Sequence, residues 1–361
     1  MAALWSLQGV GRQTLNSLAA HGPLAQWLEV DAPRLLPLAE WTPRAKRSIG
    51  TLRTLAHVAD ALERHLAALG HDIAFAGDPQ YPERLTELDT APPLLFVVGP
   101  GARATPRRRV AMVGTRHPDQ GFLERARFFA EETARAGVGI VSGGAEGVDQ
   151  ACHGAALRAG GETWAFLGCA LDQADPAQQV LFEPFRDHGG TLFSEFPPGA
   201  RSSRSTFPRR NRLIAWAADA VLVLRAPMGS GALHTVDFAQ RQGRPVLAIP
   251  GDFFNPTASA CNALIRSGVA RICLEPSDVL EAVGMSPTMA IDTPEAFAQI
   301  LTTDLSELAQ RVLLQVDRAP VDFDLLLGKT RCGSGELSAA LLELELANRV
   351  VKRTGRRYEK L

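Results

Sequence analysis

Short apolar runs alternate with amphipathic stretches between residue 108 and about residue 283 of the chain. Runs such as 108–114 and 219–227 are apolar on both faces, which is typical of strands in a buried parallel sheet. Stretches such as 123–137 have helical periodicity, and this one ends at a glycine. Repeated strand–helix units with glycine at the strand ends predict a doubly wound α/β domain of the Rossmann-like type.

The pattern gives approximate bounds for each element of this central domain. The predicted strands cover 94–98, 108–114, 138–144, 163–168, 191–199, 219–227 and 245–251. The predicted helices cover 123–137, 147–161, 177–189, 209–218 and 232–243.

Both ends of the chain differ in pattern from this centre. Residues 1–70 have helical spacing and predict a small helical unit of the SAM-like or helix-hairpin-helix-like kind. Its turn Gly9-Val10-Gly11 either brings backbone N–H groups to a phosphate or simply joins two helices, and the scarcity of nearby basic residues favours the second interpretation. The central domain is assigned to 71–285 and a linker to 286–303. Residues 304–361 read as helix, turn, longer helix and basic hairpin, the order of a winged helix-turn-helix domain.

Composition excludes several protein classes. With 46% hydrophobic residues the 361-residue chain can bury full cores, and its 38 basic and 39 acidic residues leave a formal net charge of −1. Any nucleic-acid binding must therefore come from local clusters of charge. The five cysteines show no CxxC spacing, so we expect reduced thiols rather than disulfides or a zinc site. We find no signal peptide or membrane-spanning run and expect a cytoplasmic protein.

Glycines, hydroxyls and arginines follow the predicted strands. Ligands of open α/β sheets lie beyond the carboxyl ends of the strands, where glycine allows close backbone approach and helix N-termini attract anions. Segment 201–212 adds five arginines and no acid, with Phe207 among them. Such a cluster suits single-stranded DNA, because arginines hold phosphates while a ring stacks on a base. The competing interpretation places Phe207 in the core and the arginines in salt bridges. The candidate DNA-binding residues are Gly114, Arg116, Ser142, Gly143, Gly144, Phe207, Arg209, Arg210, Asn211, Arg212, Gly229, Ser230 and Gly231.

No catalytic residue, cofactor or metal is expected. The first turn reads GTRHPDQG rather than GxGxxG, and there is no GxxxxGK[ST] motif. His153 and His234 lack partners at triad or metal spacing. Asp149 is most simply a first-turn carboxylate that either favours the helix dipole or braces the glycine turn. In the C-terminal unit the predicted recognition helix, 335–349, is acidic while the tail beyond it is basic. Protein contact and weak DNA contact therefore remain open for this unit.

Several motifs follow one another in an order that resembles one known family. They are VAMVGTRHP (110–118), GIVSGGAEGVDQACHGAAL (139–157), FLGCALD (166–172), SEFPPG (194–199), FPRRNRLIAWAADAVLVL (207–224), SGALHT (230–235) and AIPGDFFNPTASACNALIRSGVA (248–270). Together they resemble the DNA-processing protein A family, also called DprA or Smf. The helical N-terminal unit and the winged-helix unit resemble flanking domains of that family.

The resemblance implies a homodimer that binds single-stranded DNA, protects the incoming strand and loads RecA recombinase during natural transformation. Single-strand-binding protein is a further candidate partner. Carried over by position, Arg116 and the FPRRNR arginines would contact phosphates, residues 142–144 would offer backbone donors, and Phe207 would lie near a base. We leave Glu146 out of this site, because a carboxylate there would repel phosphate unless it points away.

Two other functions compete with this one. The first is a nucleotide-binding or nucleoside-phosphate-hydrolysing enzyme of a related Rossmann-like family, although the loop MGSGALHT supplies no carboxylate for it. The second is a duplex-specific regulator that acts through the C-terminal winged helix, although the acidic helix argues against insertion into a groove.

Overall fold

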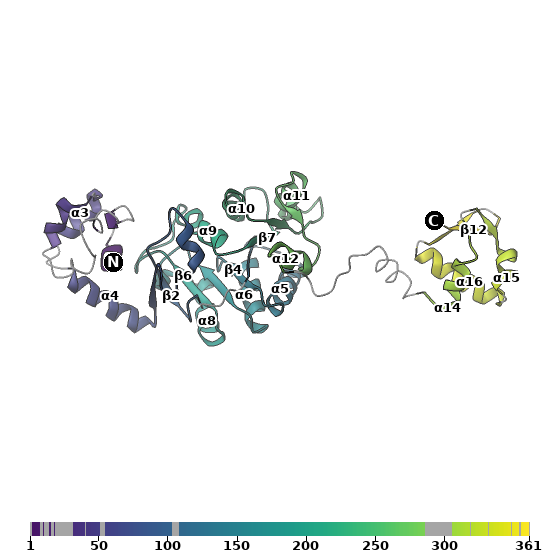
Figure 1. The fold of residues 1–361 in the computed structure, drawn as a ribbon, viewed down its shortest axis with the longest axis horizontal. Coiled ribbons are helices and arrows are strands. Elements are labelled where there is room, and N and C mark those ends of the chain that lie inside the picture. Colours follow the sequence, from purple (N-terminus) through teal and green to yellow (C-terminus); the bar gives the residue numbers. More distant parts are fainter. Residues whose placement is uncertain are drawn as a thin grey trace. The chain divides into compact units, whose positions relative to one another are not determined.

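The computed structural model describes residues 2–7, 10, 14–15, 18, 32–39, 41–50, 55–102, 108–285, 305–317, 319–330, 332–347, 349–353 and 355–360. The chain divides into two compact units, Met1–Ser286 and Pro287–Leu361 (Figure 1). The proposed linker 286–303 and the glycines of the turn at 9–11 lie outside the described residues.

Nine strands of the described residues form one sheet in the first unit, in the order β1-β2-β6-β5-β4-β3-β7-β8-β9. The strands from β6 through β9 in this order are parallel, and β1 and β2 add an antiparallel edge. Their bounds are β1 Asp72–Phe75, β2 Leu94–Val98, β3 Arg109–Gly114, β4 Gly139–Ser142, β5 Thr163–Phe166, β6 Thr191–Ser194, β7 Ala220–Arg225, β8 Val246–Ala248 and β9 Arg271–Ile272.

Helices cover both faces of this sheet (Figure 1). Helices α9, α10 and α11 pack on one face, where Leu213, Val236 and Cys261 join a cluster with alternate strand residues. Helices α5, α6 and α12 pack on the other face around Phe122 and Cys152. The bounds are α5 Gln120–Arg135, α6 Val148–Arg158, α7 Pro176–Gln179, α8 Phe182–His188, α9 Thr206–Trp216, α10 Ala232–Arg241, α11 Ser259–Arg266 and α12 Pro276–Ala282. The strands are therefore buried on both faces, as their continuous apolar runs predict.

The structure corrects the predicted elements in three places. Strand β6 stops at Ser194 rather than continuing to 199, since Pro197 and Pro198 have no N–H for a ladder. The predicted helix 177–189 is two helices, because the chain tightens to a hydrogen bond from the Leu181 N–H to the Gln178 carbonyl, 3.0 Å long. Helix α9 begins at Thr206, three residues early, since proline is tolerated in a first turn. In addition, strands β1 and β9 are absent from the predicted set.

The N-terminal segment contributes short helices to the first unit. They are α1 Ala2–Trp5, the 3₁₀ helix η2 Ala32–Leu38, α3 Pro43–Gly50 and α4 Ala56–Leu69. Leu4, Trp41 and Ile49 are buried in one cluster with Leu94 and Phe96 of β2. This clustering gives the helical segment an apolar core shared with the edge of the sheet.

The second unit has its own core and its own small sheet. Its elements are α14 Glu307–Leu313, β10 Val321–Asp322, α15 Phe323–Thr330, α16 Ser334–Leu346, β11 Val350–Arg353 and β12 Arg357–Lys360. The three strands pair antiparallel in the order β10-β12-β11. Three helices followed by a hairpin is the arrangement predicted for a winged helix. Across the described residues of both units, no helix is long and apolar enough to span a bilayer.

Candidate nucleic-acid interface

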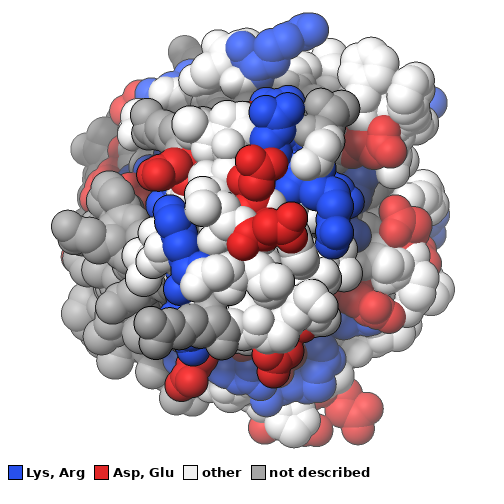
Figure 2. All heavy atoms as spheres, turned by 90° about the vertical axis from the view of Figure 1, so that its right-hand side faces the viewer, with Lys and Arg blue, Asp and Glu red and all other residues white. Residues whose placement is uncertain are grey.

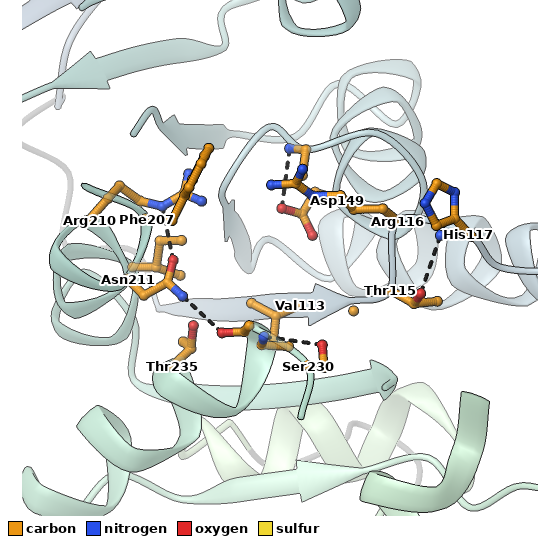
Figure 3. Close-up of a pocket in the computed structure, with 15 residues that line it drawn as sticks. Val113, Thr115, Arg116, His117, Asp149, Phe207, Arg210, Asn211, Ser230 and Thr235 are labelled. Atoms are coloured by element: carbon orange, nitrogen blue, oxygen red, sulfur yellow. Dashed lines mark hydrogen bonds between the residues drawn. The ribbon is translucent and has the colours of Figure 1, made fainter. Parts of the chain in front are cut away.

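The sheet changes direction of strand addition at β3, and a cavity lies beside this point. Strands β4, β5 and β6 extend from one side of β3, and β7, β8 and β9 extend from the other. Such a switch point leaves a crevice beyond the carboxyl ends of the strands. A cavity of about 300 Å³ occupies this position (Figure 3). Its lining comprises Val113, Gly114, Thr115, Arg116, His117, Ala145, Asp149, Phe207, Arg210, Asn211, Ile214, Ser230, Gly231, Ala232 and Thr235.

Arg116 is the exposed cation of this cavity. It follows β3, and its guanidinium carbon lies 5.3 Å from the ring centroid of Phe207, which enters from α9. Among the described residues, no carboxylate lies within ion-pair distance of Arg116. Its charge is therefore available to an anion from solvent.

Arg210 is a second cation, fixed behind the first. The side chain is only 5% exposed. Its guanidinium donates to the carbonyl of Gly143 at 2.6 Å and to that of Phe166, and its Nε donates to Asn211 Oδ1 at 3.0 Å. Burial lowers the pKa of Arg210 to about 10; the charge of Asp149 opposes this shift and that of Arg116 adds to it. Arg210 is thus protonated at neutral pH and adds a fixed positive charge to the cavity wall.

Asp149 holds the glycine turn after β4. One carboxylate oxygen, Oδ2, accepts from the Gly143 N–H at 3.1 Å and from the Ala145 N–H at 3.3 Å. Burial raises the pKa of this carboxyl, and the nearby charge of Arg210 acts in the opposite direction. The prediction that Asp149 braces the turn is confirmed. The Gly143 N–H, predicted to donate to a phosphate, donates to Asp149 in the structure, and its contact with DNA stays a prediction.

The glycines of the site admit neighbouring groups. A Cβ on Gly143 would lie 2.6 Å from the Arg210 guanidinium, and one on Gly114 would lie 2.8 Å from the Val148 side chain. At Gly147, where φ is +89°, a Cβ would lie 2.6 Å from the Arg116 carbonyl oxygen. The absence of side chains thus lets α9 and the β3 turn approach closely enough to place both arginines.

The FPRRNR arginines have different partners. Arg212 is 8% exposed and lies 2.6 Å from Glu195 Oε2, and the half-exposed Arg209 lies 3.1 Å from the same oxygen. The segment is acid-free in sequence, but the residue after the preceding strand supplies a buried carboxylate. The expected phosphate contact is therefore corrected for Arg212, whose guanidinium pairs inside the protein.

The remaining candidates divide between cavity and surroundings. Asn211 donates from Nδ2 to the Gly231 carbonyl at 3.0 Å, and Ser230 Oγ accepts from the Ala232 N–H at 3.3 Å, so both order the start of α10. Ser142 is fully buried and donates to the Met112 carbonyl, which corrects its predicted place in the lining. Gly144, Arg209, Arg212 and Gly229 also lie outside this lining.

A family model described as DNA recombination-mediator protein A matches residues 72–284, more than half of the chain. A second model, the DprA winged helix domain, matches residues 298–356. The chain belongs to the DNA-processing protein A family. This membership confirms the resemblance found in the motifs, the Rossmann-like α/β fold and the winged-helix domain at the C-terminal end.

Relatives and solved structures of the family match large parts of this chain. The protein Smf of Synechocystis is 32% identical over an alignment of 314 positions, and the match covers 78% of this chain and 78% of that protein. The crystal structure of DprA from Streptococcus pneumoniae superposes with a TM-score of 0.63 and 28% identity, covering 78% of this chain and 95% of that one. A structure reported for the single-stranded DNA binding mode of DprA from Helicobacter pylori superposes with a TM-score of 0.52 and 26% identity. The match covers 59% of this chain and 95% of that one.

The candidate list omits four residues that build the site, and a fifth, Glu146, was considered and left out. Thr115, His117 and Thr235 line the cavity, and a Cβ on Gly168 would lie 2.9 Å from the Phe207 ring. Glu146, which we left out, is exposed at an adjoining cavity of about 70 Å³ that Arg116 and Arg210 also line. Thr235 ends the motif SGALHT and Gly168 lies in FLGCALD, which marks both in the sequence, whereas only the structure shows how close Gly168 lies to Phe207.

The C-terminal unit presents a mixed surface. On the face drawn in Figure 2, acidic and basic side chains are interspersed. Arg353 of the hairpin pairs with Glu359, and the Arg356 guanidinium carbon lies 4.3 Å from the Phe323 ring centroid. These two basic groups therefore interact within the unit.

Proposed function

We propose that this protein binds single-stranded DNA in the cavity beside β3. The observation that carries the proposal is the pairing of an exposed arginine, Arg116, with a fixed buried one, Arg210, around the half-buried ring of Phe207. Two cations beside an aromatic ring in a concave site match a flexible polyanion, whose phosphates meet the guanidinium groups. The relative from Helicobacter pylori, whose structure is described by its single-stranded DNA binding mode, supports this assignment.

The role that we propose is that of a recombination mediator rather than an enzyme. The protein protects incoming single strands in natural transformation and loads RecA recombinase onto them, working as a homodimer in the cytoplasm. Membership of a family described as recombination mediators supports this role. The cavity carboxylate Asp149 already accepts two backbone N–H groups through one oxygen, which suits a structural brace better than a general base.

A titration of a fluorescein-labelled oligothymidylate, followed by fluorescence anisotropy, tests the binding site. We expect Arg116→Ala to weaken binding by about 10-fold or more, because a hydrogen bond to a charged group contributes roughly 1.5–3 kcal/mol. The plot of the logarithm of the association constant against the logarithm of the salt concentration has a negative slope. Its magnitude should decrease by about 0.7 for each phosphate that the variant no longer neutralises.

Arg135→Ala is the matched control, because Arg135 is an exposed arginine at the far end of α5 that pairs with Glu131 and Glu132. Its affinity should equal that of the unchanged protein. Equal affinity of Arg116→Ala and the unchanged protein would remove the proposed cavity from consideration.

RecA loading needs its own measurement. The rate of RecA filament assembly on single-stranded DNA coated with single-strand-binding protein reports loading. We expect the protein to accelerate this assembly and Arg116→Ala to do so weakly. Sedimentation velocity of the same sample tests the dimer, and a monomer that loads RecA fully would contradict the homodimer.

A further inference from the structure

Two aromatic rings stand exposed in the loop after β8. Phe253 and Phe254 are each 88% exposed, and their ring centroids lie 5.4 Å apart at 80°, an edge-to-face arrangement. Binding of another molecule over such exposed apolar side chains is favourable, because it removes apolar surface from water. The pair is therefore a candidate contact surface.

Hydrogen bonds within the loop hold the two rings outward. The Phe254 N–H donates to Asp252 Oδ1 at 2.8 Å, and the Asn255 N–H donates to the Asp252 carbonyl at 3.0 Å. At the base of the loop, Asn262 accepts from the Gly251 N–H at 3.0 Å and donates to the Gly251 carbonyl at 2.9 Å. A ligand that meets these rings thus finds them already placed, which reduces the entropy lost on binding.

The loop belongs to the same edge of the sheet as the arginine cavity. Strand β8 pairs with β7, and the turn after β7 supplies Ser230 and Gly231 to the cavity. This turn and the segment after the aromatic loop are joined, since the Met228 N–H donates to Ser259 Oγ at 3.1 Å and the Ala260 N–H donates to the Ala226 carbonyl at 3.0 Å. The cavity wall and the aromatic loop are therefore neighbours on one continuous edge.

The cavity itself offers little free ring surface to a base. Phe207 is half-buried, a Cβ on Gly168 would lie 2.9 Å from its ring, and the guanidinium of Arg116 lies over it. Phe253 and Phe254, in contrast, have open ring faces. A strand held by its phosphates in the cavity finds unoccupied stacking surfaces one turn further along the sheet edge.

The surroundings favour a nucleic acid over a protein partner. The exposed large apolar side chains of the turns after β7 and β8 are Met228, Phe253 and Phe254, flanked by the polar residues Asp252 and Asn255, and Ile272 and Leu274 are exposed on and after the next strand, β9. Three apolar side chains among polar neighbours form a smaller patch than a stable protein interface requires. Two ring faces are sufficient for stacking on bases. The Asp252 carboxylate accepts the Phe254 N–H through Oδ1 and so helps to hold the loop.

We propose that Phe253 and Phe254 form a stacking platform for the bases of a single strand that continues out of the arginine cavity. This inference rests on the proposed function, since the cavity must first hold the strand. It extends the site from β3 and β7 to β8 and gives the strand a direction across the sheet edge.

Two oligonucleotide lengths separate the platform from the cavity. The double variant Phe253→Ala, Phe254→Ala should bind an oligothymidylate of about 16 nucleotides some 5- to 100-fold more weakly, because stacking of one base contributes about that factor. An oligothymidylate of about 4 nucleotides fills the cavity alone, so its affinity should not change. Phe128→Ala, which removes another exposed ring, on α5, should leave both affinities unchanged.

Conservative variants distinguish stacking from simple apolar contact. Phe253→Trp should keep the affinity for the longer strand, whereas Phe253→Leu should lose much of it, because leucine lacks a flat ring. If the double alanine variant binds both lengths normally while Arg116→Ala weakens both, the platform is overturned and the cavity stands. If the unchanged protein binds neither length, the proposed function itself fails. A variant that binds DNA normally but self-associates less or loads RecA more slowly would assign the rings to a protein partner and overturn the platform.

Discussion

The cavity beside β3 and the hairpin of the C-terminal unit both gather arginines, but they hold them differently. In the cavity, Arg210 is buried against backbone carbonyls, and the exposed Arg116 has no carboxylate partner among the described residues. In the hairpin, Arg353 pairs with Glu359 and Arg356 lies over the Phe323 ring. By the number of basic residues alone, the hairpin and its tail would be as good a candidate for DNA binding as the cavity. The cavity is the better candidate for DNA binding, because it is concave and its exposed arginine has no carboxylate partner among the described residues.

The same contrast operates within α9. Arg210 and Arg212 are two residues apart, yet one faces the cavity and the other pairs with the buried carboxylate of Glu195. Residues two apart on a helix point in different directions, so one helix serves both the site and the core. The position of the partner carboxylate therefore decides which arginine remains available to DNA.

The largest expected effect comes from removing the buried cation of the cavity. Arg210→Met leaves the Gly143 and Phe166 carbonyls without their donor and the buried Asp149 without its compensating charge. Loss of one partner of such a buried charged arrangement costs roughly 3–5 kcal/mol. We expect urea unfolding of the first unit to show a loss of this size, together with loss of oligothymidylate binding.

Arg353→Met in the hairpin is the matched control for this variant. Its ion pair with Glu359 is exposed, so we expect an unchanged urea midpoint and unchanged DNA affinity. A larger effect from Arg353→Met than from Arg210→Met would invert the comparison and assign the essential cation to the hairpin.

Acid should weaken the first unit more than the second. His153 is fully buried, with Nδ1 2.7 Å from Thr163 Oγ1, and burial lowers its pKa to about 3. Because the unfolded chain takes up this proton near pH 6.5, the histidine's contribution is complete above pH 6.5 and declines as the pH falls toward 3. Residues 304–361 contain no histidine.

We expect unfolding of the first unit to lose on the order of 2–3 kcal/mol between pH 6.5 and pH 4, partly offset by Asp149, whose raised pKa acts in the opposite direction. Urea unfolding at a series of pH values measures this loss. His153→Gln should flatten the dependence while leaving that of the second unit unchanged, and an equally steep dependence in this variant would show that other groups cause it.

A single methyl group tests how closely the cavity is packed. In Gly143→Ala the new Cβ would lie 2.6 Å from the Arg210 guanidinium, which cannot move without losing its carbonyl partners. Overpacking of this kind costs typically 1–3 kcal/mol. We expect that loss in urea unfolding and a fall in DNA affinity. In Gly121→Ala the nearest atom is Asp119 Oδ1 at 3.6 Å, so stability and binding should persist, and equal effects from both variants would contradict the packing argument.

The sequence predicts the strands and turns that position the site better than it predicts the contacts between side chains. Strands β3 and β7 are buried on both faces, so each appears in the sequence as a continuous apolar run that predicts a strand directly. Glycine-rich turns at the strand ends then place Gly114, Arg116 and Gly231 at one edge, and all three line the cavity. This much follows from local pattern and the general topology of doubly wound sheets.

Contacts between distant segments lie beyond that reasoning. Glu195 pairs with Arg212 across 17 positions, and Arg210 fills the space above Gly143 across 67 positions. No spacing rule relates a buried carboxylate after one strand to an arginine on the next helix, so the acid-free run leaves open which of its arginines form salt bridges. Pattern alone also misses the edge strand β9, because two exposed residues carry no apolar run.

The smallest expected effect comes from deleting the C-terminal unit. The first unit, Met1–Ser286, is compact by itself and contains the whole lining of the cavity, whereas Arg353 and Arg356 of the hairpin interact within their own unit. A chain that ends at residue 303 should therefore bind the 16-nucleotide oligothymidylate within about 3-fold of the full chain, since loosely held surface cations add mainly a screened, nonspecific attraction. Anisotropy titrations at low and at physiological salt measure this. The small difference should shrink further as salt rises. A loss of about 10-fold or more that persists at physiological salt would mean that the winged helix is the principal DNA-binding unit and that the cavity contributes little.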